Sequence, residues 1–156
     1  SGSDMIGIVE FNSSCFYRYS LVHIDKLVEN LGFNRDLLRT AVLIFIESSI
    51  KAIPTGKQNS MAAQNPAGYA RVIVRKDGFP WSLANAFQMP VAAGLNESIE
   101  ERSIEALNHY FDKLVKVYGD STILCDRWFN VNDPASISLD LMINDVGNVL
   151  ANEVSS

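Results

Sequence analysis

A stretch of 29 residues, from Ser48 to Lys76, contains no acidic residue, although the chain as a whole is acidic. With 18 Asp and Glu among 156 residues, about three acids would be expected in a stretch of this length. Its basic residues are Lys51, Lys57, Arg71, Arg75 and Lys76. Such a cluster is typical of an anion site, although a buried loop and strand that simply avoid acids would give the same pattern.

The most promising groups for anion binding lie in the loop Gly56-Lys57-Gln58-Asn59-Ser60. This loop offers one ammonium group, two side-chain amides and one hydroxyl, next to a glycine that lets the backbone approach a ligand closely. These groups bind phosphate and sugar oxygens, and such contacts do not distinguish one base from another. We therefore predict that the loop grips a phosphate backbone and does not read sequence.

Other chemistry finds little support in the sequence. The Gly-Lys pair of the loop does not belong to a nucleotide-binding phosphate loop, because Lys51 and Gln58 occupy the positions of the required glycine and hydroxyl residue. Neither His23 nor His109 has further ligands at the spacing of a metal site. A G-x-S-x-G nucleophile motif is also missing from the sequence.

Four carboxylates in the last third of the chain raise the alternative of a two-metal nuclease site. They belong to Asp126, Asp133, Asp140 and Asp145. Their spacing fits exposed positions at a strand end and on a helix better than it fits a shared site. We therefore expect no catalytic residue, no metal site and no cofactor.

Bulk properties place the chain among ordinary globular domains. It has 156 residues, which is enough for one domain with a real core, and 47% of them are hydrophobic. No apolar run could span a membrane, and the first residues do not resemble a signal peptide. The net charge of −5 by itself argues against nucleic acid as a partner. Because Cys15 and Cys125 form no motif, we expect two reduced core thiols in a cytoplasmic protein, with a disulfide between them as the less favoured alternative.

Hydrophobic periodicity and capping residues predict the elements that position these groups. Strands are predicted over Ile8–Val22, Tyr69–Val74 and Ile123–Val131, and helices over the ranges that follow Asp25, Asn34, Glu97 and Ser138, with stops at Gly32, before Pro54 and at Gly119. This order is typical of an α+β domain, in which the first two strands are expected to pair. The helix that follows Asn34 has so wide an apolar stripe that we expect it to be central and well covered.

Three stretches of the sequence resemble the signatures of a known family. They are EFNSSCFYRY at Glu10–Tyr19, GKQNSMAAQNP at Gly56–Pro66 and PWSLANAFQMPV at Pro80–Val91. They resemble the segments E-F-x-S-x-x-F-Y-R-Y, K-Q-x-x-x-A-A-x-N-P and S-x-A-N-A-F of the CasC (Cse-type) family, the backbone subunit of the type I-E CRISPR Cascade complex. Because all three occur in order, with a helix pair between the first two, the resemblance is specific and covers residues 2–91.

The resemblance implies the fold and the extent of the domain. It implies a partial RNA-recognition-motif-like (ferredoxin-like) palm with packed helices, lacking the N-terminal half of the family's protein. The chain, residues 1–156, would then be a single domain and the C-terminal fragment of a larger backbone subunit. Residues 1–95 would supply palm strands and helices, and residues 96–156 the C-terminal helical part.

The resemblance also implies a function in antiviral defence. The family's subunit binds CRISPR guide RNA by its sugar-phosphate backbone, oligomerises along it as a filament, contacts other Cascade subunits and meets target DNA through the guide. It is not an enzyme and has no membrane partner. The RNA-binding role carries over best to Lys57, with Gln58, Asn59 and Ser60, and less directly to Arg18.

Two parts of the family signatures are expected to serve the fold rather than RNA. Tyr17 and Tyr19 lie on the apolar side of the first predicted strand, so we expect them in the core. The segment Ser82–Phe87 is expected to shape the fold or a contact with a neighbour. The alternative functions are a protein-interaction scaffold without direct RNA contact and, less favoured, a metal-dependent nuclease.

Overall fold

The computed structural model describes residues 14–53 and 64–154 of the chain. The chain divides into two compact units, and each has its own set of elements. The first unit contains the described residues up to Tyr19 together with residues 82–114, and the second contains residues 20–81 and 115–156. No helix in the described ranges is both long and apolar enough to cross a membrane.

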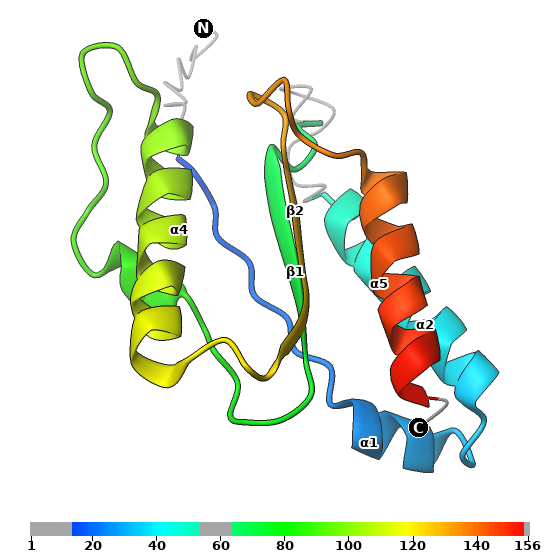
Figure 1. Ribbon diagram of the computed structural model, residues 1–156. Helices are drawn as coiled ribbons and strands as arrows, with labels where there is room; N and C mark the ends of the chain where they lie inside the picture. Colours follow the sequence, from blue (N-terminus) through cyan, green and yellow to red (C-terminus); the bar gives the residue numbers. More distant parts are fainter. Residues whose placement is uncertain (1–13, 54–63, 155–156) are drawn as a thin grey trace, which may run out of the picture. The chain divides into compact units, whose positions relative to one another are not determined.

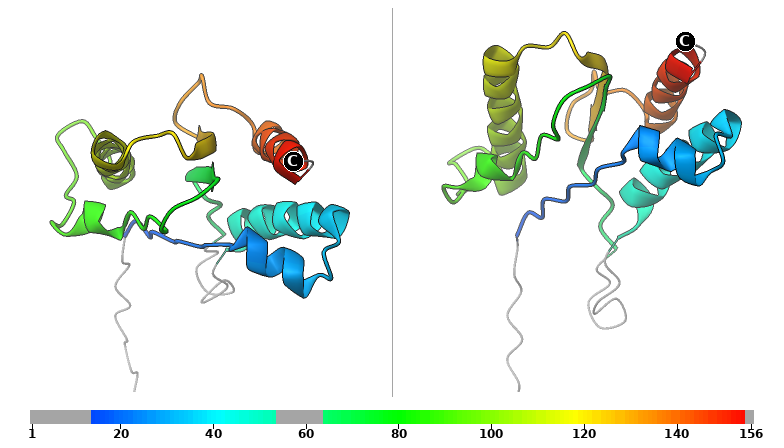
Figure 2. Two further views of the ribbon diagram at one scale, coloured as in Figure 1. Left: turned by 60° about the horizontal axis from the view of Figure 1, so that its bottom comes forward. Right: turned by 90° about the horizontal axis from the view of Figure 1, so that it is seen from below.

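The second unit is a two-stranded antiparallel sheet with helices on one face (Figure 1). Its elements are α1 (Ile24–Asn30), α2 (Arg35–Lys51), β1 (Tyr69–Arg75), β2 (Ile123–Asn130) and α5 (Leu139–Val154). Helices α2 and α5 lie side by side against the sheet, as two further views show (Figure 2). This arrangement confirms the α+β class.

The core of the second unit lies between the sheet and the two helices. Its buried residues are Leu38, Val42, Cys125, Val146 and Leu150, and Val72 and Val74 of β1 pack against them. Helices α2 and α5 also meet through a hydrogen bond, in which Arg39 Nε donates to the carbonyl of Gly147 over 2.9 Å. A Cβ atom at position 147 would lie 2.9 Å from Arg39 Nη2, so a larger residue there would force the Arg39 side chain to shift.

The partner of β1 is β2, with Tyr69 opposite Asn130 and Val74 opposite Cys125. The prediction that a strand at Ile8–Val22 pairs with β1 is wrong for residues 14–22, and residues 8–13 lie outside the described part of the chain. The described part of that range, residues 14–22, forms no strand. Its apolar alternation is present, but a strand also needs a neighbouring backbone to bond with, and the described residues show no ladder between this range and β1.

Local sequence signals correctly predicted most helix ends. Asn34 Oδ1 accepts from Leu37 N at the start of α2, and Ser138 Oγ accepts from Leu141 N at the start of α5. Gly32 ends α1 with a φ of 61°. The N-cap of α1 is His23 rather than the predicted Asp25, and its Nδ1 accepts from Lys26 N over 3.4 Å.

The outward side of α2 contradicts the expectation of a well-covered helix. Only Leu38 and Val42 of this helix are buried. Leu37, Ile44 and Phe45 are 46%, 58% and 42% exposed. The apolar stripe of α2 is therefore wider than the surface that α5 and the sheet cover.

The first unit is built around most of α4 (Ile99–Tyr118) and the short helix η1 (Ala84–Phe87). Leu83, Leu107 and Phe111 are buried. The Tyr17 hydroxyl accepts from Leu83 N over 3.1 Å, and the Tyr17 ring lies 5.4 Å from that of Phe87. These contacts confirm the structural role expected of Tyr17 and of the segment around Leu83.

The beginning of α4 forms a capping box. Ser98 Oγ accepts from Glu101 N over 3.1 Å, while the Glu101 carboxylate accepts from Ser98 N over 2.7 Å. The backbone and side-chain hydrogen bonds from Ser98 lower the pKa of Glu101. At its other end α4 stops at Gly119, which has a φ of 78°, as the sequence predicts.

Exposure of Cys15 and of Tyr19 corrects the expectation that both lie in the core. Tyr19 is 44% exposed, and Cys15 is exposed, whereas Cys125 is buried. Both residues lie in the range 14–22, where the expected strand is not formed. Side chains that alternate along an unpaired segment have no sheet face to pack on.

The two thiols should therefore react differently. Burial raises the pKa of the Cys125 thiol and also shields it from reagents. We expect an aromatic disulfide reagent to modify Cys15 rapidly in the native chain and Cys125 only after unfolding. Mass spectrometry of native and denatured samples measures this, with Cys15→Ser as the control. Equal labelling rates in the native chain would contradict the assignment.

Candidate nucleic-acid interface

Most of the predicted site residues lie outside the part of the chain that the structure describes. They are Lys57, Gln58, Asn59 and Ser60. The structure describes the chain on either side, where α2 ends at Lys51 and Gln64 leads towards β1. Arg18 is described and exposed, in the first unit. Their roles in RNA binding remain predictions.

The fold neutralises part of the acid-free segment with acids from outside it. Lys51 Nζ lies 2.5 Å from Glu47 Oε1, one turn earlier on α2, and this hydrogen bond raises the pKa of Lys51. Arg71 on β1 donates to both carboxylate oxygens of Asp126 on β2, over 2.8 and 2.5 Å. In the folded chain, the segment therefore has fewer unpaired cations than its sequence suggests.

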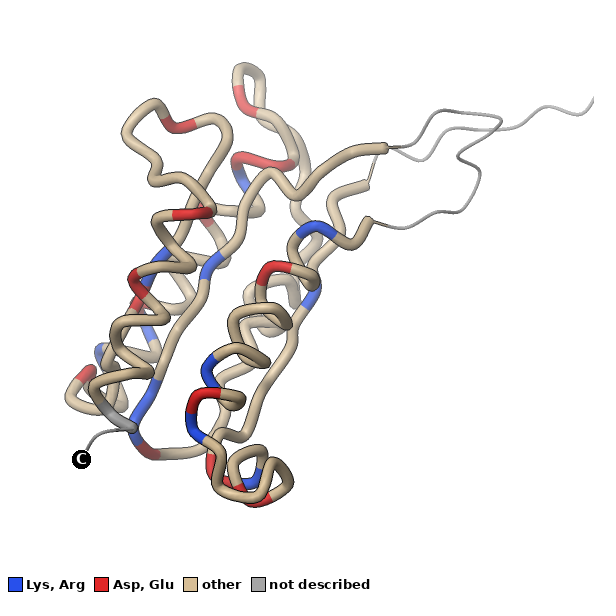
Figure 3. The backbone as a smooth tube through the Cα atoms, turned by 90° about the vertical axis from the view of Figure 1, so that its right-hand side faces the viewer, with Lys and Arg blue, Asp and Glu red and all other residues tan. Residues whose placement is uncertain are grey.

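The helical side of the second unit is not a basic surface. Along α2 basic and acidic positions follow one another, and α5 carries no Lys or Arg (Figure 3). Between α5 and β2, Arg127 is paired with Asp145 over 2.5 Å, and this hydrogen bond raises the pKa of the guanidinium group. Contacts to a polyanion are therefore not expected over these helices.

The other face of the sheet, which points away from α2 and α5, has a different character. We call it the outer face, and it carries Tyr69, Arg71, Asp126 and Trp128. Their position follows from the register, because Arg71 lies opposite Trp128 and opposed side chains share a face, as do residues two apart on one strand. The core residues Val72, Val74 and Cys125 occupy the opposite face.

Two aromatic rings stack on the outer face. The ring centroids of Tyr69 and Trp128 are 6.4 Å apart, and the ring planes differ by 24°. Trp128 is 40% exposed. Sequence reasoning missed this pair, although a signal was present: Trp128 alternates with Asp126 and Asn130, and is thus an aromatic residue on a polar side of its strand.

A second aromatic cluster surrounds Arg75 at the other end of β1. The guanidinium carbon of Arg75 lies 4.1 Å from the centroid of the Trp81 ring, and its nitrogens donate to Thr122 Oγ1 and to the Phe79 carbonyl. Tyr118 packs against Trp81 with ring centroids 6.0 Å apart. Arg75 is thus engaged on several sides and holds the turn that follows β1.

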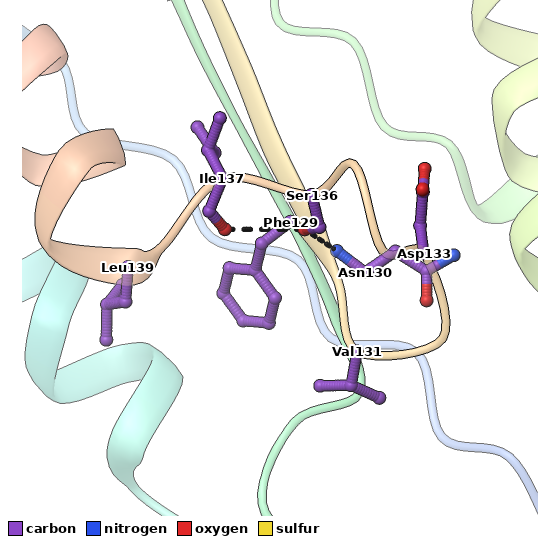
Figure 4. A pocket seen from close by; sticks show the side chains of 7 residues that line it. All are labelled: Phe129, Asn130, Val131, Asp133, Ser136, Ile137 and Leu139. Atoms are coloured by element: carbon purple, nitrogen blue, oxygen red, sulfur yellow. Dashed lines mark hydrogen bonds between the residues drawn. The ribbon is translucent and has the colours of Figure 1, made fainter.

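A pocket of about 320 Å³ lies where β2 ends and the chain turns towards α5 (Figure 4). Its polar groups hold the turn itself. Ser136 Oγ accepts from Asn130 N over 2.8 Å, Asn130 Oδ1 accepts from Asn132 N, and Asp133 Oδ1 accepts from Ala135 N. Because these polar groups bond to the turn itself and the lining includes the carboxylate of Asp133, this pocket is poorly suited to an anion.

A wider groove of about 780 Å³ lies in the first unit. Apolar side chains of the segment after η1, among them Met89 and Val91, line one part of it. Arg102, Glu105 and Asp112 of α4 bring both signs of charge, and the exposed His109 lies beside them. A lining that combines apolar side chains with both signs of charge does not favour a particular class of ligand.

Three of the four carboxylates considered for a nuclease site have separate structural partners. Asp126 binds Arg71, Asp145 binds Arg127, and Asp133 holds the turn after β2. Within residues 14–53 and 64–154, no three His, Cys, Asp or Glu side chains come together as a metal site. Nothing in the described part of the chain therefore supports metal-dependent hydrolysis.

Solved structures that are similar to this chain include two from CRISPR complexes. The first belongs to a "CRISPR RNA-guided surveillance complex", with 27% identity, a TM-score of 0.70 and coverage of 81% of this chain and 50% of that chain. The second belongs to a "CRISPR RNA-guided surveillance complex, pre-nicking", with 27% identity, a TM-score of 0.68 and coverage of 83% and 36%. The chain thus spans half or less of the length of these relatives.

Comparison with protein families gives a match over nearly the whole sequence. No curated protein matches the chain. The family model described as "CT1975-like protein" matches residues 1–146, which include the stretches around Arg18, Lys57 and Trp128. Because the match covers far more than half of the sequence, the chain belongs to the CT1975-like protein family.

Proposed function

We propose that the chain is part of a guide RNA-binding backbone subunit of a type I-E CRISPR surveillance complex. The single observation that carries this proposal is the family match over residues 1–146. The similarity to chains of two RNA-guided surveillance complexes supports it. The three signature stretches support the CasC-type assignment within this class.

In this proposal the protein holds RNA without reading its sequence. Lys57 neutralises a phosphate, while Gln58, Asn59 and Ser60 hydrogen-bond to phosphate or sugar oxygens. Arg18 adds a second cation from the first unit. Strands β1 and β2 are two strands of an RNA-recognition-motif-like palm, with α2 and α5 packed on its back. Bases of the guide remain free to pair with target DNA.

The subunit acts by binding and not by catalysis. Copies of it line up along the guide RNA as a filament, together with other subunits of the complex. Each copy that grips the backbone releases counterions, which makes assembly sensitive to salt. Incubation with RNA and Mg²⁺ should leave the RNA intact, and metal-dependent cleavage would contradict a purely structural role.

Salt-dependent RNA binding tests the proposal. The chain should bind single-stranded RNA with little base preference, and Lys57→Ala should weaken binding several-fold because one phosphate contact is lost. The slope of log K against log salt should become shallower by about 0.7, the share of one contact on a single strand. Filter binding at salt concentrations between roughly 50 and 200 mM measures both quantities.

Lys26→Ala is the matched control for this experiment. Lys26 is an exposed lysine of α1, so its replacement removes the same charge from the helical side. We expect that it changes neither affinity nor slope appreciably. Equal effects of the two substitutions would reject Lys57 as a specific contact, and absence of RNA binding by the unaltered chain would reject the function.

The exposed apolar side of α2 favours a second candidate function, that of a protein-interaction scaffold. Leu37, Ile44 and Phe45 form this side, and large apolar residues gathered in one place often mark a contact with another protein. A scaffold of this kind would keep its partners after nuclease treatment and at high salt. An RNA-dependent assembly would lose them under both conditions.

A further inference from the structure

We propose that Tyr69 and Trp128 form a stacking platform for one base of single-stranded RNA on the outer face of the sheet. The inference deepens the proposed function and rests on it. The predicted loop around Lys57 supplies contacts to the backbone only. The aromatic pair would add contact with a base plane, which is independent of the identity of the base.

The geometry of the pair suits this role. Tyr69 and Trp128 come from adjacent strands, and their rings are nearly parallel, with planes 24° apart. Tyr69 is half-buried and supports Trp128 from one side, while Trp128 is 40% exposed. A tryptophan that is held in place and still open to solvent offers a base a large flat surface at little cost in side-chain entropy.

Charge on the outer face favours a polyanion as the ligand. Along one side of β1 lie Arg71 and Arg75, and Asp126 of β2 neutralises the first of them. Arg75 remains cationic and stacks on Trp81, with no carboxylate among its hydrogen-bond partners given by the structure, Thr122 and Phe79. Arg71 and Asp126 cancel on the outer face itself, so Arg75, farther along β1, is the cation left to attract a polyanion to this side of the sheet.

Continuity along the chain connects the platform to the predicted phosphate grip. Residues 64–68 lead directly from the loop that contains Lys57 into Tyr69 at the start of β1. These five residues carry no charge. The platform therefore follows the predicted phosphate grip directly in the sequence.

Side-chain oxygens beside the platform already accept hydrogen bonds within the protein. Both oxygens of Asp126 accept hydrogen bonds from Arg71, and Asn130 Oδ1 accepts from Asn132 N. Stacking without directed hydrogen bonds tolerates any base. The platform is therefore expected to add affinity and to leave sequence preference unchanged, as a subunit that must accept many guides requires.

Substitution of Trp128 tests the platform. Trp128→Leu should weaken binding of a fluorescently labelled single-stranded RNA about 5- to 50-fold, while the salt slope stays unchanged because no charge is removed. Trp128→Phe should retain most of the affinity. Trp81→Phe is the matched control, since Trp81 is engaged by Arg75 and Tyr118 and should not contribute.

Tryptophan fluorescence gives a readout that does not depend on a disruptive variant. The chain has two tryptophans, so Trp81→Phe leaves Trp128 as the sole reporter. Bound RNA should quench its emission in proportion to occupancy, and Trp128→Phe with Trp81 retained should show little quenching. Unchanged Trp128 emission at saturating RNA would overturn the platform even if Trp128→Leu proves unfolded.

The outcomes also separate this inference from the proposed function. If the chain binds RNA and Lys57→Ala weakens binding, but Trp128 substitutions alter neither affinity nor emission, only the platform is rejected. If the unaltered chain binds no RNA in filter binding or fluorescence, the proposed function fails, and the platform fails with it.

Discussion

Replacement of Leu38 by alanine should lower the free energy of unfolding by about 2 to 5 kcal/mol. Leu38 is 1% exposed and lies in the cluster that joins α2 to β2 and α5. Its truncation removes apolar contacts and leaves a cavity, since the helices on either side are held by other residues of the same cluster. Equilibrium unfolding in urea, followed by circular dichroism, measures the loss.

Ile44→Ala is the control on the same helix. Ile44 is 58% exposed on the outward side of α2, so the same kind of truncation should cost no more than about 0.5 kcal/mol. The urea m-value should be similar for both variants, which shows that the same unfolding transition is measured. Comparable losses for Leu38 and Ile44 would contradict the packing of α2 described above.

Arg71→Ala should be the second large effect, with an expected loss of about 2 kcal/mol. The side chains of Arg71 and Asp126 are 12% and 27% exposed, and two hydrogen bonds join them. The substitution leaves a carboxylate in a partly buried position without its cation. Because the pair is screened from solvent, we expect the loss to depend only weakly on salt in thermal or urea unfolding.

Arg127→Ala is the matched control on the neighbouring strand. Arg127 also pairs with an aspartate, Asp145, but its side chain is 45% exposed, so the loss should stay below about 1 kcal/mol. Combining Arg71→Met with Asp126→Leu should recover part of the lost stability, since no charge is then left unpaired. Equal losses for the two arginines would show that burial of the pair is unimportant.

The acid-free segment shows that counting charges along the sequence does not give the charge of a surface in the folded chain. The sequence places five basic residues and no acid between Ser48 and Lys76. In the folded chain Asp126, 55 positions after Arg71, neutralises one of them, and Glu47 neutralises Lys51. The sequence cannot show these pairs, because strand register and helical spacing bring acids from outside the segment next to its cations.

Local structure was largely predictable because its causes are local. Caps such as Asn34 and Ser138 act within three residues, and Gly32 and Gly119 stop helices through their own backbone angles. The strands that became β1 and β2 alternate in the sequence as they do in the sheet. His23 was missed as a cap because histidine seldom serves as one, and Asp25 is a more usual residue for the position.

The largest errors of the sequence-based predictions concern what each segment packs against, rather than where the helices and strands lie. The range 14–22 alternates like a strand but joins no sheet in the described part of the chain, and Cys15 and Tyr19 are exposed. Helix α2 has an apolar stripe that predicts full cover, but α5 and the sheet cover only one side of it. Periodicity reports which side chains could be buried, and it does not report what is available to bury them.

Local sequence patterns thus account for the α+β class, the positions of most helices and strands, and the basic, acid-free segment that contains Lys57. The pairing of Asp126 with Arg71 and the stacking of Tyr69 on Trp128 arise only in the folded chain. Both contacts depend on the register between β1 and β2, and the residues that they join lie more than fifty positions apart in the chain. Contacts of such separation follow from how the whole core packs, and no local pattern in either strand encodes them.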